Sequence, residues 1–282
     1  IDTDPALAII PCGSGNGLAR HLMLPLSVKD AISIINEFEV HRLDYGVIDG
    51  HPFLCTCGMG FDAFIAEKFA SAGKRGLMTY VEKIFKDGLS YESETYSYSI
   101  DGQEPVEKKA WLISCANASQ YGNNAYIAPQ ASMRDGELDI VVMEPFNLLN
   151  AVSVNMEMIN KTLDKNSRTS MFKGKCVTVT REKPGFIHFD GEPVMANETV
   201  EVHLVEQGIN VVVNGNADKS KRRPNMFQNA MSEFFNDVDT LQRAITEKRK
   251  IIQQDIVEKG KTIHRKNQDL LSKLTGGNTH ID

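Results

Sequence analysis

A glycine-rich segment near the start of the sequence has the residue types of a phosphate-binding loop. An apolar run at residues 6–10 leads into Gly13, Ser14, Gly15 and Asn16, and a helical pattern follows at residues 18–22. Glycines between a strand and a helix let backbone N–H groups approach a phosphate closely, and the helix N-terminus adds positive potential. Similar segments also occur in turns that only reverse the chain, so the spacing alone leaves both interpretations open.

Two carboxylates flank a glycine later in the chain, at Asp190, Gly191 and Glu192. Acids separated by one residue at a tight turn can face one pocket, where one accepts a hydroxyl proton and the other holds a cation or orients a nucleotide. Because Asp-Gly is also a favoured dipeptide of hairpin turns, a plain hairpin is the alternative.

A third polar segment, residues 121–139, contains Asp135 next to Gly136 and ends at Asp139. Carboxylate and carbonyl oxygens are the ligands that Mg²⁺ prefers, so these residues could hold such a cation. A surface turn is the default alternative.

The remaining reactive side chains carry no recognisable pattern. The five cysteines, at positions 12, 55, 57, 115 and 176, have neither C-x-x-C pairing nor zinc-ligand spacing, which indicates reduced packing residues of a cytosolic protein. No histidine lies at metal-ligand spacing from another, and His188 is predicted to be a structural residue on a strand.

The elements that must position these residues fall into three regions. Residues 1–40 predict a buried parallel strand at 6–10 and two helices, the second at 28–38 with Ser27 as its N-cap. Residues 41–215 predict a β-sandwich with short strands, interrupted by helices at about 62–71, 77–86 and 148–163. The expected strands are 44–48, 53–57, 95–100, 110–115, 138–143, 176–180, 185–190, 199–204 and 209–213.

Residues 216–282 predict a charged helical tail, which docks onto the body or onto a second copy of the chain in a homodimer. Acidic residues outnumber basic ones before residue 216, whereas basic residues predominate after it. An acidic body argues against nucleic acid as the main partner. The longest apolar runs are far shorter than the ~20 residues that span a bilayer, so any membrane contact is expected to be peripheral. The basic residues 219–223 could touch anionic headgroups or form a solvated linker.

The order of the motifs resembles the diacylglycerol kinase catalytic family, which includes sphingosine, ceramide and bacterial lipid kinases. The likeness extends over about residues 6–213. Its motifs are the glycine loop with Asn16 and Arg20, Cys57 to Ala63, Lys74 to Tyr80, Tyr121 to Asp139, and Asp190-Gly191-Glu192.

The resemblance implies an α/β plus β fold: the remainder of an N-terminal α/β nucleotide-binding domain similar to those of phosphofructokinases and NAD kinases, then a β-sandwich. It implies an ATP- and Mg²⁺-dependent kinase in the cytoplasm that acts on a membrane lipid. In the family pattern Gly13, Ser14, Gly15 and Asn16 line the ATP site. Asp190 matches the proposed general base, Glu192 its acidic companion, and Asp135 the ligand of a structural Mg²⁺.

Two departures from the family pattern matter. The family's Gly-Gly-Asp-Gly-Thr loop is expected a few tens of residues before Ile1, so the chain as given is expected to be inactive alone. Gly17 stands where many bacterial diacylglycerol kinases have aspartate. Two other functions stay open: a kinase of a soluble dinucleotide, similar to NAD kinase, and a regulator that binds nucleotide or lipid without catalysis.

Overall fold

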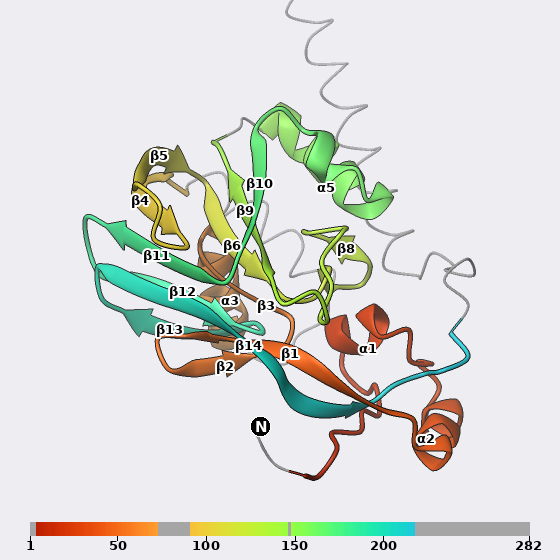
Figure 1. Ribbon diagram of the computed structural model, residues 1–282. Coiled ribbons are helices and arrows are strands. Elements are labelled where there is room, and N and C mark those ends of the chain that lie inside the picture. Colours follow the sequence, from red (N-terminus) through yellow and green to blue (C-terminus); the bar gives the residue numbers. More distant parts are fainter. Residues whose placement is uncertain (1–3, 73–90, 146–147, 218–282) are drawn as a thin grey trace, which may run out of the picture. The chain divides into compact units, whose positions relative to one another are not determined.

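The computed structural model of the protein describes residues 4–72, 91–145 and 148–217 (Figure 1). The chain divides into two units, Ile1–Met231 and Ser232–Asp282, and every described residue belongs to the first. The helix expected at 77–86, the family motif at 74–80 and nearly all of the predicted tail, with its basic residues 219–223, lie outside the described residues.

Two antiparallel six-stranded sheets dominate the described structure (Figure 1). The first sheet has, in spatial order, β2 (His51–Phe53), β1 (Val40–Ile48), β14 (Thr199–Val212), β11 (Cys176–Arg181), β4 (Glu94–Ile100) and β5 (Val106–Ala110). The second has β10 (Thr169–Gly174), β9 (Leu138–Met143), β6 (Leu112–Ala116), β3 (Thr56–Gly60), β12 (Gly185–Phe189) and β13 (Glu192–Ala196). A separate hairpin pairs β7 (Gln120–Gly122) with β8 (Ala125–Tyr126).

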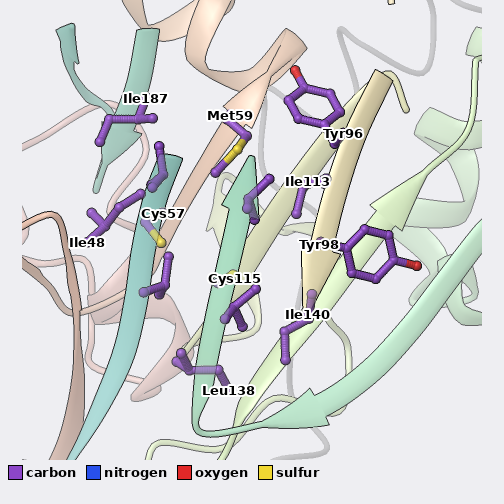
Figure 2. Packing of buried hydrophobic residues seen from close by; sticks show 14 of the residues in the cluster. Ile48, Cys57, Met59, Tyr96, Tyr98, Ile113, Cys115, Leu138, Ile140 and Ile187 are labelled. Carbon is purple, nitrogen blue, oxygen red and sulfur yellow. The ribbon is translucent and has the colours of Figure 1, made fainter. Parts of the chain in front are cut away.

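The main hydrophobic core lies between the two large sheets. Ile48 and Tyr96 of the first sheet belong to the same buried cluster as Met59, Ile113 and Ile187 of the second (Figure 2). The strands reach this core because their apolar residues alternate with polar ones. In β11 and at the start of β14, for example, every second residue is buried. The predicted β-sandwich is therefore confirmed.

The N-terminal segment packs at one end of β14 rather than forming a sheet of its own. Leu7 makes a single parallel bridge to Val211, and the Leu7 and Ile10 side chains are 37% and 43% exposed. The prediction of a buried parallel strand at 6–10 is therefore wrong. An apolar run becomes such a strand only when neighbours flank it on both sides, and among the described residues β14 is its only strand neighbour.

The described residues form only a few helices. α1 (Gly17–His21) and α2 (Val28–Glu37) follow the glycine loop at nearly the predicted positions, and α3 (Phe61–Ala72) packs on β3, β12 and β13. α5 (Leu148–Asn160) and a short 3₁₀ helix (Leu163–Lys165) precede β10. Among the described residues, no helix is both long and apolar enough to cross a membrane.

One predicted strand is interrupted at the point where the chain passes from the first sheet to the second. Residues 53–57 were expected to be a single strand, but β2 ends at Phe53 and β3 begins at Thr56. The backbone N–H groups of residues 54–56 donate to the carboxylate of Asp190. The expected strand breaks because this partner, which lies far along the chain, takes those donors.

Candidate active site

The side chain of Asn16 fixes the conformation of the glycine loop, residues 13–17. Asn16 has a left-handed backbone (φ 51°), and its side chain both accepts from the Gly13 N–H at 3.0 Å and donates to the Gly13 carbonyl at 2.8 Å. Arg20, which lies in α1, donates from Nε to the Gly15 carbonyl at 3.1 Å. Gly13 and Ser14 are exposed. This geometry fits a loop that presents backbone to a ligand, but α1 has only five residues, so its dipole adds little.

The hairpin of β7 and β8 supports the other side of the glycine loop. The Asn123 N–H donates to the Gly15 carbonyl at 2.9 Å, and a Cβ on Gly122 would lie 3.0 Å from the Gly15 backbone. A Cβ on Gly17 would lie 3.0 Å from the Tyr121 carbonyl oxygen. An aspartate at this position would therefore be crowded, which gives a physical reason for a glycine at position 17.

Asp190 is the first residue of the two-residue turn that joins β12 to β13. Asp190 and Gly191 have φ values of 49° and 90°, as a type I′ hairpin requires. Its carboxylate accepts three backbone N–H bonds: Oδ2 from Leu54 at 2.7 Å, and Oδ1 from Cys55 at 2.7 Å and Thr56 at 3.1 Å. A carboxylate has about four lone-pair positions. The bonds from the described residues leave one of these positions, on Oδ2, for a hydroxyl donor.

Two opposing effects set the pKa of Asp190. Although Asp190 as a whole residue is exposed, desolvation of its carboxyl by the surrounding protein raises the pKa, whereas the three N–H donors and His188 act to lower it. The raised pKa is compatible with accepting a proton, because an efficient base has a pKa closer to the working pH than an ordinary aspartate.

Asn117 forms hydrogen bonds to the segment 54–56, whose N–H groups donate to Asp190. The buried Asn117 side chain donates to the carbonyls of Leu54 and Asp44, each at 2.9 Å, and the Asn117 backbone N–H donates to the Cys55 carbonyl at 2.9 Å. His51 stacks on Phe189 with 4.6 Å between the ring centroids. These contacts fix the position of the Asp190 turn against the first sheet, and the sequence pattern did not predict them.

Two other turns of the fold also have an aspartate whose carboxylate accepts backbone N–H bonds from a distant segment. Asp49 and Asp101 also have left-handed backbones and precede glycines. Asp49 Oδ1 accepts from the Glu201 N–H, and Asp101 Oδ1 accepts from the N–H groups of Lys175 and Cys176. The turn bonds of Asp190 are thus no sign of catalysis by themselves, and Asp49 and Asp101 provide natural controls for it.

Glu192 and Asp135 occupy different parts of the structure. Glu192 opens β13 opposite Phe189 and is exposed, so its carboxylate can reach a ligand at the Asp190 turn. Asp135 instead pairs with Lys173 of β10, with 2.6 Å between Asp135 Oδ2 and Lys173 Nζ. Glu137 and Asp139 place oxygens 3.6 Å and 3.5 Å from the same ammonium. A lysine therefore supplies positive charge beside the residue predicted to bind structural Mg²⁺.

Replacing Lys173 with methionine is expected to lower the free energy of unfolding by about 1–2 kcal/mol, between the values typical of exposed and of buried ion pairs. Burial raises the pKa of the Asp139 carboxyl, and Lys173 opposes that rise. The pKa of Asp139 is raised even with Lys173 present, so without Lys173 the folded protein holds the Asp139 proton still more tightly relative to the unfolded chain. The loss should therefore grow as pH rises above about 4. Denaturant unfolding at pH 4.5 and 7.5 measures it.

The control for this variant is Lys175→Met, because Lys175 pairs with Glu206 on the exposed surface, where solvent screens the ion pair, and should therefore contribute less than Lys173 does. We expect Mg²⁺ to leave the unfolding of the unaltered protein unchanged. Stabilisation by Mg²⁺ would instead support the ligand role predicted for Asp135, and equal losses in the two variants would contradict a special role for Lys173.

A buried chain of contacts joins the glycine loop to the Asp190 turn. Tyr121, next to Gly122, donates its hydroxyl to Asp62 Oδ2 at 3.2 Å, and Asp62 Oδ2 lies 3.1 Å from His188 Nε2. His188 is two residues before Asp190. The structure thus connects four of the five family motifs: the glycine loop, the Asp62 segment, the Tyr121 segment and the Asp190 turn.

Within residues 4–72, 91–145 and 148–217, no three histidine, cysteine, aspartate or glutamate side chains are arranged to hold a metal ion. An Mg²⁺ ion beside the Asp190 turn would therefore need oxygens from a bound nucleotide or from water in addition to those of the protein. The exposed carboxylate of Glu192 is a hard oxygen donor of the kind Mg²⁺ binds together with phosphates. The donor set thus fits a nucleotide-bound Mg²⁺.

Two family models match the chain. Residues 55–213 match the YegS C-terminal NAD kinase beta sandwich-like domain, and residues 1–48 match the diacylglycerol kinase catalytic domain. The first match covers more than half of the chain. The chain therefore belongs to the diacylglycerol kinase family.

Two of the three relatives described next are named as lipid or diacylglycerol kinases, and the third is uncharacterized. A probable lipid kinase YegS-like protein of Chromohalobacter salexigens is 25% identical over 68% of this chain and 62% of its own length. A diacylglycerol kinase of Mycobacterium tuberculosis is 27% identical over 67% of this chain and 63% of its own. An uncharacterized Synechocystis protein, sll0036, is 28% identical over 75% of this chain and 50% of its own. The chain thus spans half to somewhat under two thirds of the length of these relatives.

The structure of a putative diacylglycerol kinase from Bacillus anthracis has the same fold. It superposes with a TM-score of 0.60 at 22% identity, over 76% of this chain and 70% of that one. At this identity the similarity establishes the fold alone.

Proposed function

We propose that the protein is an ATP-dependent lipid kinase, which transfers the γ-phosphoryl group of ATP to a hydroxyl of diacylglycerol, sphingosine or a related membrane lipid. The observation that carries this proposal is the chain of contacts from the glycine loop through Tyr121, Asp62 and His188 to the Asp190 turn. It links a loop suited to phosphate with a turn that has one carboxylate suited to a hydroxyl, Asp190, and one suited to a cation, Glu192. Relatives named as lipid kinases support the choice of substrate class.

The proposed roles follow from the geometry of the residues. Gly13, Ser14, Gly15 and Asn16 line the ATP site, and of these Gly13 and Ser14 are exposed. The lipid hydroxyl donates to the remaining lone pair of Asp190 Oδ2, and this carboxylate accepts the proton as the oxygen attacks phosphorus. Glu192 would hold the Mg²⁺ ion, which supplies positive charge for the phosphate oxygens. Phosphoryl transfer depends mainly on such positioning and electrostatics.

The lipid substrate requires the protein to work at a membrane surface. We propose peripheral contact from the cytoplasmic side, because the substrate hydroxyl lies at the headgroup level and the reaction needs cytosolic ATP.

The test is a kinase assay on the protein in its longest natural form, with γ-labelled ATP, Mg²⁺ and vesicles that contain diacylglycerol, sphingosine or ceramide. We expect labelled lipid phosphate from at least one of these vesicles. NAD serves as the soluble acceptor in a parallel reaction. Labelled NADP without lipid product would favour the soluble-substrate alternative, and ATP binding without any product would favour a regulator.

A further inference from the structure

The buried histidine and aspartate behind the proposed site form an unusual pair for a β-sandwich. The side chains of His188 and Asp62 are 4% and 7% exposed, and the His188 Nε2 and Asp62 Oδ2 atoms lie 3.1 Å apart. Burying a carboxylate is costly unless it is paired, and an apolar pair would fill the same volume at lower cost. A role in specifying geometry would account for this pair.

The other side of the His188 ring contacts the turn of the proposed site. The backbone N–H of Gly191 donates to His188 Nδ1 at 3.4 Å. A ring nitrogen that accepts a hydrogen bond carries no proton, so in neutral His188 the proton is on Nε2, which lies 3.1 Å from Asp62 Oδ2 but is not aligned for a hydrogen bond with it. The adjacent Asp62 carboxylate favours this tautomer electrostatically, and in this tautomer His188 accepts from the turn between Asp190 and Glu192.

Asp62 also contacts Tyr121, which lies beside the glycine loop. Tyr121 Oη donates to the same Oδ2 atom at 3.2 Å, and the Ala63 N–H donates to Oδ1 at 2.8 Å. Burial and the nearby Asp62 charge raise the pKa of Tyr121 well above its usual range. Tyr121 thus keeps its proton as a donor. The backbone on either side of Tyr121 packs on Gly15 and Gly17.

We propose that Tyr121, Asp62 and His188 act as one positioning unit, which sets the Asp190-Gly191-Glu192 turn in register with the glycine loop. The proposal rests on the proposed kinase function and deepens it. None of the three residues touches the reacting atoms in this scheme. Their effect should appear in kcat, because the alignment of two substrates changes, rather than in the KM for ATP.

Two substitutions at His188 separate its two contacts. In His188→Asn the amide oxygen takes the place of Nδ1 and can still accept from Gly191. In His188→Gln the terminal amide takes the place of Nε2 and can still donate to Asp62, but the acceptor for Gly191 is lost. We expect His188→Gln to lower kcat about 10- to 100-fold with an unchanged KM for ATP, and His188→Asn to stay within about 3-fold of the unaltered protein.

His203→Gln is the matched control, because His203 is exposed on β14, and it should leave kcat unchanged. A double-mutant cycle then tests whether the residues act together. Tyr121→Phe and His188→Gln should each lower kcat, and the double variant should lose no more than about the larger single effect. Normal kcat in His188→Gln, equal losses in the asparagine and glutamine variants, or multiplied losses in the double variant would each overturn the proposal.

A second measurement separates this proposal from the kinase function. Hydrogen exchange of the Gly191 amide, followed by NMR, should become at least about 10-fold faster in His188→Gln and change little in His188→Asn. This result would retain the positioning unit even if the protein phosphorylates no lipid, in which case only the kinase function fails. Unchanged Gly191 exchange in the glutamine variant would overturn the positioning unit, whatever the activity.

Discussion

Replacing Asp190 with asparagine is expected to lower kcat for lipid phosphorylation by about 10²- to 10⁴-fold, the range typical of a positioned general base. The amide oxygen of asparagine can keep the bonds that Oδ1 accepts from Cys55 and Thr56. The negative charge, the open acceptor position on Oδ2 and the bond that Oδ2 accepts from the Leu54 N–H are lost. Two of the three bonds that hold the turn should therefore remain while the proton acceptor is removed, and steady-state kinetics on lipid vesicles measures the effect.

Asp101→Asn is the matched control for this variant. Asp101 is also the first residue of a left-handed Asp-Gly turn, and its Oδ1 accepts two backbone bonds as Asp190 Oδ1 does. Its substitution should leave kcat within about 2-fold of normal, since no reacting group depends on it. Near-normal turnover in Asp190→Asn would remove Asp190 from the mechanism and leave it as a third structural turn.

Replacing Gly122 with alanine should both destabilise the protein and weaken ATP binding. Gly122 has φ 133°, and an added Cβ would meet three backbone atoms of Gly15 at 3.0 Å. Strained backbone in a non-glycine residue costs about 1–3 kcal/mol, and the contact must also push the glycine loop away. We expect a loss of about 2–4 kcal/mol in the free energy of unfolding and an increase of at least about 10-fold in the Kd for ATP.

Gly50→Ala separates backbone strain from the displacement of the loop. Gly50 has φ 82° in the turn between β1 and β2, and no atom lies within 4 Å of an added Cβ. This variant should lose about 1 kcal/mol of stability and bind ATP normally, as calorimetric titration would show. Unchanged ATP affinity in Gly122→Ala would contradict the assignment of the nucleotide to the glycine loop.

The sandwich could be predicted because its signal is local. Alternating residues such as Val200, Val202 and Leu204 define one face of a strand within a few positions, and the structure places Val200 and Val202 in the core. The run at 6–10 was misassigned because its pattern records only apolar residues. Whether such a run is buried depends on neighbouring strands that the run itself does not specify.

The candidate site was less predictable because its contacts join distant parts of the chain. The glycine loop and the Asp190 turn could be located from residue types, and the order of the motifs indicated the family. The break at residues 54–56 depends on the Asp190 carboxylate. The role of His188 depends on Asp62, which is reached through the packing of α3 on β12. From the strand pattern alone, His188 cannot be distinguished from any other polar residue of the strand.

The most direct test of the site is hydrogen–deuterium exchange of the backbone amides, measured with and without a non-hydrolysable ATP analogue, Mg²⁺ and diacylglycerol vesicles. The contact chain predicts that the nucleotide slows exchange at residues 13–17 and 121–123 and that the addition of vesicles slows exchange at residues 190–192. Protection confined to other segments, or no protection at saturating ligand, would contradict a lipid kinase site built from the glycine loop and the Asp190 turn.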